Sequence, residues 1–238
     1  MSQQQLYFFL TEEQPCGYLP GQQSRSLCLD PRQPVTGELL GALSRQGFRR
    51  SGQLVYRPHC SDCNACIPVR VAVQDFQPDR SQRKVLNRGR QLQIIEQSPA
   101  LTDEYYLLYQ HYICARHADG SMYPPSPAQF KDFLARTSAF SRFYEFRLQG
   151  RLLAVAVSDL LPDGLSAVYS FFDPDDRYFS LGRLCVLWQI EHVRQLNLDH
   201  LYLGYWIADC QKMNYKTGYQ PLQGFFDGQW QRLGKNGG

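Results

Sequence analysis

Two stretches of the chain place apolar residues at the three- and four-residue spacing of an amphipathic helix. They are residues 101–117 (LTDEYYLLYQHYICARH) and 182–198 (GRLCVLWQIEHVRQLNL). Thr102 stands where an N-cap is expected, and two acids follow it in the first turn of the first stretch. Ser180 is the candidate N-cap of the second stretch. We therefore predict a helix over each stretch.

Shorter apolar runs bounded by turn residues predict four β-strands. Gln149-Gly150 and Pro162-Asp163-Gly164 are turn sequences, so the first three strands form a meander that starts with a hairpin. A helix, three strands, a second helix and a final strand define an α/β or α+β layer, and this order excludes a helix bundle or a β-sandwich. The predicted strands are residues 143–148, 151–161, 165–173 and 200–207.

The first 98 residues have a different pattern. Short β-like runs at 54–58 (LVYRP) and 66–76 (CIPVRVAVQDF) are interrupted by glycine and proline, and no repeat or low-complexity tract is visible. We place a boundary near residue 98, between an N-terminal lobe (1–98) and a C-terminal domain (99–238).

The composition is that of an ordinary globular protein. The chain has 238 residues, of which 43% are hydrophobic and 20% charged, so a substantial core can form. No apolar run approaches the roughly 18 residues that a membrane span needs. The first residues, MSQQQLYFFL, lack the basic start and long apolar run of a secretory signal. We therefore expect a cytoplasmic protein without a membrane partner, whose eight cysteines stay reduced.

Positive charge is concentrated in residues 45–90. This segment holds ten arginines and lysines against three acids, a local charge of +7, whereas the whole chain carries only +3. Most basic residues are arginine, whose flat guanidinium fits phosphate and carboxylate groups. Two interpretations stay open: a surface that binds a large anion such as nucleic acid, or a solvated basic face.

Three cysteines within this basic segment have the spacing of metal ligands. Cys60, Cys63 and Cys66 suit tetrahedral zinc or an iron–sulfur cluster, both of which normally need a fourth ligand. Cys16 is the best distant candidate for that ligand, and Cys28 is the next. The alternative is a turn of reduced cysteines that orders the basic segment.

Six phrases of the sequence are distinctive when they are taken together. They are PCGYLPGQQSRSLCLDP (15–31), GFRRSGQLVYRPHCSDCNACIPVRV (47–71), RSQRKVLNR (80–88), RHADGSMYPPS (116–126), LSAVYSFFDPD (165–175) and YLGYWIADCQKMNYKTGYQP (202–221). In this order they resemble the bacterial branch of the arginyl-tRNA–protein transferase family, from about residue 6 to about residue 230.

The resemblance implies a fold and an activity. The C-terminal domain would be N-acetyltransferase-like, a mixed sheet flanked by helices, behind a basic, cysteine-containing lobe. The family moves an aminoacyl group from tRNA to the N-terminal amine of a protein. In this branch leucine passes from leucyl-tRNA to proteins that begin with Asp or Glu, which marks them for degradation as N-degrons. No cofactor is required, because the donor is an activated ester.

Three other functions stay open from the residues alone. The chain could transfer arginine instead of leucine, because the sequence does not reveal the polarity of the aminoacyl pocket. It could be a coenzyme A-dependent N-acetyltransferase, although Ser180 stands where the usual acyl-carrier loop has glycine. It could also be a non-catalytic RNA-binding module. The oligomeric state is not predicted.

Five residues are candidates for the chemistry. His117 and Asp119 of the RHADG phrase suit proton transfer, since a histidine titrates near neutral pH. Glu145 is an alternative base, as is Asp159, on predicted strands, and Tyr169 could donate a hydrogen bond to an oxyanion or line the leucyl pocket. For each of these side chains, an ordinary structural role is the competing interpretation.

The candidate binding residues are cations, aromatic residues and a helix start. Cations would contact the tRNA backbone or the acidic acceptor, aromatic rings would stack on terminal bases, and the start of the second predicted helix would seat a phosphate. The cations are Arg80, Arg83, Lys84, Arg116, Arg177, Lys212 and Lys216; the aromatic residues are Tyr205, Trp206 and Tyr215; the helix start contains Ser180 and Gly182.

Overall fold

An eight-stranded mixed sheet forms the centre of the computed structural model, which describes residues 5–120, 122–136 and 138–234. Neighbouring strands are antiparallel except β11 and β12, which run parallel. In spatial order the strands are β14 (Gln229–Leu233), β13 (Leu222–Phe226), β7 (Ile67–Ala72), β12 (His200–Trp206), β11 (Gly164–Phe172), β10 (Arg151–Leu161), β9 (Ser141–Leu148) and β8 (Gln93–Gln97).

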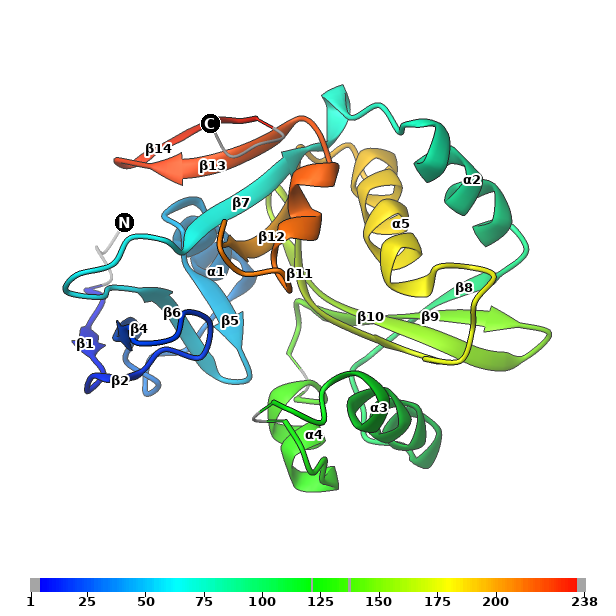
Figure 1. Ribbon diagram of the computed structural model, residues 1–238, viewed down its shortest axis with the longest axis horizontal. Helices are drawn as coiled ribbons and strands as arrows, with labels where there is room; N and C mark the ends of the chain where they lie inside the picture. Colours follow the sequence, from blue (N-terminus) through cyan, green and yellow to red (C-terminus); the bar gives the residue numbers. More distant parts are fainter. Residues whose placement is uncertain (1–4, 121, 137, 235–238) are drawn as a thin grey trace.

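Helices cover both faces of this sheet (Figure 1). On one face lie α2 (Arg80–Gly89) and α5 (Leu181–Gln195), and on the other lie α3 (Asp103–Arg116) and α4 (Pro127–Phe133). Because strand side chains alternate between the faces, Tyr144 and Phe146 pack in the core under α5, whereas Phe143 packs in the core under α3. The predicted α+β class, a mixed sheet flanked by helices, is confirmed.

A smaller sheet and one helix form the N-terminal part of the molecule (Figure 1). Leu40, Phe48 and Val55 make a third core there, which also includes Tyr202 of β12. The elements are α1 (Gly37–Arg45), the sheet strands β1 (Phe8–Leu10), β4 (Ser26–Leu29), β6 (Leu54–Pro58) and β5 (Arg49–Ser51) in spatial order, and the separate pair β2 (Gln14–Pro15) and β3 (Gln23–Ser24).

A buried ion pair joins the small sheet to the large one. Nε and Nη2 of Arg50, on β5, each donate to the carboxylate of Asp159, on β10, at 2.7 Å. Ser141 Oγ also donates to this carboxylate at 2.6 Å, and Arg50 Nη1 donates to Gly52 O at 2.7 Å. The side chains of Arg50 and Asp159 are 7% and 0% exposed, so every strong donor and acceptor here has a protein partner.

The large sheet contains strands from both sides of residue 98. β7 and β8 precede that residue, and β7 pairs with β12 and β13 from the far end of the chain. A short 3₁₀ helix, η1 (Val73–Asp75), follows β7 directly. The predicted lobe and the predicted domain therefore share one sheet.

The helices and strands predicted for the second half are present. Thr102 caps α3, since its hydroxyl accepts a hydrogen bond from Tyr105 N. The meander β9–β10–β11 turns at Gln149 and Gly150, both with positive φ, and at residues 162–163. In the part of the chain that the structure covers, no helix is both long and apolar enough to cross a bilayer.

Candidate functional site

β11 and β12 separate after three paired positions. Gly164–Ser166 pair with His200–Tyr202, and no later residues of the two strands are paired with each other. On β12 the register with β7 shifts between Tyr202 and Gly204, and Gly204 has φ +72°. Such a bulge bends the strand that carries it. We call the unpaired part, from Ala167 on β11 and Leu203 on β12, the strand opening.

Arg49 of β5 reaches into the strand opening. Its Nη2 donates to Val168 O of β11 at 3.4 Å, and its guanidinium carbon lies 5.9 Å from the ring centre of Tyr205 on β12. A Cβ atom at position 204 would lie 2.9 Å from Arg49 Nη1, so Gly204 leaves room for the guanidinium. The small sheet thus places a positive charge between the two separating strands.

A second cation lies close to Arg49. Lys216, in the 3₁₀ helix η2 (Asn214–Gly218), is 3% exposed, and its Nζ donates to Tyr205 O and lies 3.2 Å from Met213 Sδ. Burial and, secondly, the charge of Arg49 lower the pKa of Lys216 to about 7. Because this amine faces the interior, the phosphate contact predicted for Lys216 has no surface on which to form.

The aromatic residues of the β12–η2 segment differ in exposure. Tyr205 is 2% exposed, and its hydroxyl donates its one hydrogen between two carbonyl oxygens, Tyr56 O at 3.0 Å and Gly47 O at 3.2 Å, which ties β12 to the small sheet. Trp206 is also buried. Neither ring presents a free face to a tRNA base in this structure, and the stacking role stays a prediction. Tyr215, by contrast, is 55% exposed and is free to stack.

The RHADG phrase meets the β12–η2 segment. Lys212 Nζ lies 2.9 Å from Asp119 Oδ2, an ion pair between two exposed side chains. His117 ends α3, and its Nε2 lies 3.1 Å from the Tyr112 hydroxyl. Burial, followed by the charge of Lys212, lowers the pKa of His117. The imidazole is therefore neutral at pH 7 and able to accept a proton.

The two strand carboxylates are already engaged. Glu145 accepts hydrogen bonds from Tyr105 Oη and from Arg147 Nε, the latter at 2.8 Å. Burial alone would raise its pKa, but the bonds from Arg147 and Tyr105 lower the pKa of Glu145 below its usual value. Asp159 is held by Arg50, as described above. Both carboxylates have structural partners that a general base would have to give up.

Tyr169 lies beside Tyr112, the tyrosine whose hydroxyl is within hydrogen-bond distance of His117. Its ring packs edge-on against Tyr112 and Phe133, and its hydroxyl lies 3.6 Å from Met122 Sδ. Burial raises the pKa of Tyr169, so its hydroxyl remains a donor at neutral pH. In this position the side chain of Tyr169 can form part of the wall of a site near His117.

The predicted cations of α2 are exposed. Arg80, Arg83 and Lys84 all face solvent on a helix that carries five cations and no acid between residues 80 and 90. The helix begins at a capping box formed by Asp79 and Gln82. Arg116 and Arg177 are also exposed, the first at the end of α3 and the second before α5.

The start of α5 differs from the sequence expectation in its capping. Ser180 occupies the N-cap position, but it has φ +54° and its hydroxyl caps no backbone N–H. Gly182 lies where a Cβ atom would come within 2.8 Å of Phe172 Cε1, so the helix packs tightly against the end of β11. The unusual cap turns the chain sharply between the loop and the helix.

The predicted cysteine ligands lie close enough to Cys66 for their charges to affect its thiol. Burial, followed by the charges of Cys16, Cys60, Cys63 and Cys210, raises the pKa of the Cys66 thiol to about 12. Tyr18 N donates to Cys16 Sγ at 3.5 Å.

The number of these cysteines suits a metal site. However, no three of the cysteines in the described ranges have sulfur atoms all within 4.8 Å of one another. Zinc, with Zn–S bonds of about 2.3 Å, would require them to draw together. Metal binding and a reduced cysteine turn both stay predictions.

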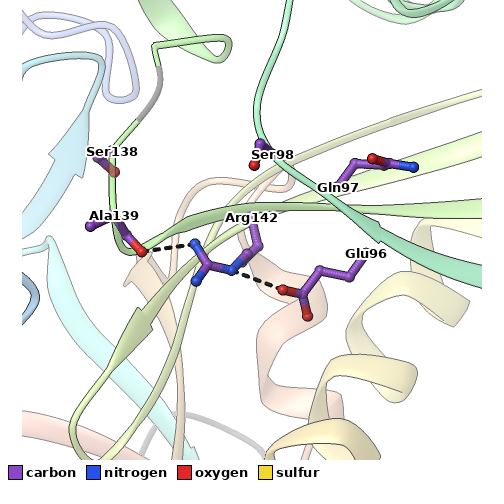
Figure 2. Close-up of a pocket in the computed structure, with 6 residues that line it drawn as sticks. All are labelled: Glu96, Gln97, Ser98, Ser138, Ala139 and Arg142. Atoms are coloured by element: carbon purple, nitrogen blue, oxygen red, sulfur yellow. Dashed lines mark hydrogen bonds and ion pairs between the residues drawn. The ribbon is translucent and has the colours of Figure 1, made fainter.

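A separate hollow of about 660 Å³ lies away from the strand opening, at the edge of the large sheet formed by β8, next to β9 (Figure 2). Arg142 crosses it, donating to Glu96 Oε1 and to Ala139 O. None of the residues predicted for the site lines this open, polar surface. Its lining consists of Glu96, Gln97, Ser98, Ser138, Ala139 and Arg142.

Sequence reasoning missed Arg49 and two of the tyrosines near it, Tyr18 and Tyr56. Adjacent strand residues point to opposite faces, so in a strand containing Arg49-Arg50 the two guanidiniums must have different surroundings. That signal was present in the sequence. Which arginine lies in the strand opening depends on how the two sheets pack, which the pattern does not encode.

Comparison with known proteins identifies the family. The model for the N terminus of arginine-tRNA-protein transferase matches residues 14–84, and the model for its C terminus matches residues 104–226. The chain belongs to the arginine-tRNA-protein transferase family and is a transferase.

Curated relatives are similar over nearly the whole chain. The aspartate/glutamate leucyltransferase of Pseudomonas aeruginosa (strain LESB58) is 54% identical over 228 residues, covering 96% of this chain and 97% of that protein. The protein of the same name from Pseudomonas fluorescens (strain Pf0-1) is 53% identical over 225 residues, 94% and 96% of the two chains. Among solved structures, L-PGS from Bacillus licheniformis aligns with a TM-score of 0.47 at 10% identity, over 60% of this chain and 47% of that one.

Proposed function

We propose that this protein transfers leucine from leucyl-tRNA to the N-terminal α-amine of proteins that begin with Asp or Glu, in the cytoplasm, and so marks them as N-degrons. The supporting observation is the 54% identity, over 96% of the chain, to a curated aspartate/glutamate leucyltransferase. The cations of the strand opening and the neutral histidine at the end of α3 support a site for this reaction.

The reaction needs positioning more than strong catalysis. The acceptor nitrogen attacks the ester carbonyl carbon, the bond to the tRNA ribose oxygen breaks, and an amide forms. A free α-amine has a pKa near 7.7–8.0, so roughly a tenth or more is neutral at pH 7. Proximity can supply about 7–11 kcal/mol of the barrier. One proton leaves the amine, and one is returned to the ribose oxygen.

His117 is the proposed proton carrier. It is neutral at pH 7, whereas Glu145 and Asp159 are held by arginines. We expect His117→Gln to lower kcat by about 100-fold, the lower end of what a positioned acid–base group contributes. His111→Gln, an exposed histidine of the same helix, should leave kcat unchanged.

The measurement is single-turnover leucine transfer as a function of pH. Protonation of the acceptor amine should slow both proteins as the pH falls below about 8. The wild type should show a further loss of rate below pH 6.5, because the pKa of His117 is lowered from that value. An equal pH profile in the wild type and His117→Gln would remove this assignment.

The exposed cations of α2 are the proposed tRNA-binding surface. We expect log Kd for leucyl-tRNA to rise linearly with log salt concentration. Replacing Arg80, Arg83 and Lys84 with Gln should reduce that slope by about 0.7–0.9 for each phosphate that the variant no longer binds.

Filter binding at several salt concentrations measures the slope. Gln substitutions at Arg32, Lys131 and Arg136, three exposed cations elsewhere, are the matched control and should keep the wild-type slope. If both triple variants behave alike, the tRNA does not bind on α2.

The test of the function is transfer itself. The purified protein is incubated with leucyl-tRNA or arginyl-tRNA and with peptides that begin with Asp, Glu or Ala. Mass spectrometry then determines the masses of the peptide products. We expect one leucine on the Asp and Glu peptides and none on the Ala peptide. Arginine transfer instead, or tRNA binding without any transfer, would each contradict the proposal.

A further inference from the structure

Arg49 and Arg50 are neighbours in the sequence with opposite surroundings. Arg50 donates to Asp159 through Nε and Nη2, to Ser141 Oγ through Nη2 as well, and to Gly52 O through Nη1. Arg49 makes one hydrogen bond in the described part of the chain, to Val168 O at 3.4 Å, and it belongs to no ion pair there. A guanidinium has five N–H donors, and away from water it is normally paired.

The groups around Arg49 raise the free-energy cost of leaving its charge without an anion. The nearby cation is Lys216, and it too has no carboxylate within 4 Å among the described residues. Two like charges in a partly desolvated site repel each other, as the lowered pKa of Lys216 reflects. Its other polar neighbours include the hydroxyl groups of Tyr18, Tyr56, Tyr205 and Tyr215, and none of these is a carboxylate. Such a site is stabilised when an anion enters it.

A ligand can reach this guanidinium. Arg49 is only partly buried, and none of its nitrogens is sealed from solvent without a partner. Tyr18 and Tyr215, which lie close to it, are 43% and 55% exposed. The charge therefore lies beside partly exposed tyrosines and keeps contact with solvent, rather than lying in the closed core.

We propose that Arg49, with the charge of Lys216 beside it, binds the side-chain carboxylate of the acceptor protein's first residue. This inference rests on the proposed leucine transfer for the identity of the acceptor. Arg49 would then be the residue that selects Asp and Glu over their amides, because a guanidinium pairs in parallel with the two oxygens of a carboxylate.

The position favours a carboxylate over a tRNA phosphate. Arg49 lies inside the strand opening, against β11 and β12, whereas the chain's dense row of phosphate-suited arginines is exposed on α2. A side-chain carboxylate is a small, planar end group that can enter such a site. A phosphodiester is flanked by two sugars and needs a groove along its strand.

The test measures peptide binding, which does not require transfer. Calorimetry with saturating uncharged tRNA compares peptides that begin with Asp and with Asn, for wild type, Arg49→Gln, Arg49→Lys and Arg57→Gln. Arg57 is on the next strand of the small sheet and serves as the matched control. Thermal unfolding confirms that each variant is folded.

We expect the wild type to prefer the Asp peptide and Arg49→Gln to weaken its binding on the order of 100-fold, as for loss of one partner of a desolvated charge pair. Binding of the Asn peptide should change by less than about threefold, because an amide makes no charge pair. Arg49→Lys should recover part of the preference, since it keeps the charge but not the fork. Arg57→Gln should bind as the wild type does.

Four results would overturn the inference. They are an absence of Asp preference in the wild type, a preference that survives in Arg49→Gln, an equal loss for both peptides, and a loss of tRNA binding in place of peptide selectivity. If the expected pattern appears but no leucine is transferred, the carboxylate site stands and the proposed function fails. If Arg49→Gln does not fold, the comparison of wild type with Arg49→Lys decides.

Discussion

Arg50→Met is expected to lower the free energy of unfolding by about 3–5 kcal/mol, because it leaves the buried carboxylate of Asp159 without its charge partner. Asp159 is 0% exposed and would retain only the hydrogen bond from Ser141 Oγ. Urea denaturation followed by fluorescence measures this difference. The loss should also loosen the small sheet, since the pair joins β5 to β10.

Two further variants separate charge from shape. The double variant Arg50→Met with Asp159→Leu should recover most of the stability, because a matched apolar pair has no unpaired charge. Arg32→Met removes an ion pair whose arginine is 89% exposed and should change stability by less than about 0.5 kcal/mol. An Arg50→Met variant as stable as Arg32→Met would show that the pair does not join the sheets.

Gly164→Ala is expected to destabilise the protein by about 3 kcal/mol or more. A Cβ atom at this position would lie 1.9 Å from the backbone oxygen of His200, at the first of the three paired positions of β11 and β12. Backbone cannot give way as a flexible side chain does, so the strands must move apart. Leucine transfer should fall with stability, because the strand opening begins directly after these paired positions.

Gly150→Ala is the matched control for this substitution. Gly150 has φ +85°, but a Cβ atom there would meet nothing within 4 Å, so only backbone strain of about 1–2 kcal/mol is expected. Circular dichroism melts of both variants give the comparison. Equal melting temperatures would mean that β11 and β12 are not held at the observed spacing.

The periodic elements of the second half could be predicted because their patterns are strong. α3 has a hydroxyl cap followed by acids, and β9 to β11 have turn residues at both bends. α2 was missed, because its apolar stripe is narrow and one of its two fully buried side chains is the polar Gln82. β7 was expected as a strand, but its partners come from residues 200–226, and no local pattern specifies them.

The candidate site was predicted only in outline. The β12–η2 segment lies near both the cysteines and the RHADG phrase, which no pattern in the sequence specified. Exposure, however, differs between two lysines for which the sequence predicted the same role. Lys212 is 63% exposed, whereas Lys216, four residues later, is 3% exposed. The unpaired state of Arg49 depends on which side chains from distant segments surround it, and hydrophobic periodicity does not carry that information.

The most direct test of the account is the place where the aminoacyl end of tRNA binds. A leucyl-tRNA analogue with a non-hydrolysable amide link and a photoreactive group on its terminal adenosine is cross-linked to the protein, and the labelled peptides are sequenced. We predict labels at the strand opening and beside it, on residues 203–219 and 116–120. Labels on β8 and β9 around Arg142, at the hollow on the β8 edge of the sheet, would contradict this account.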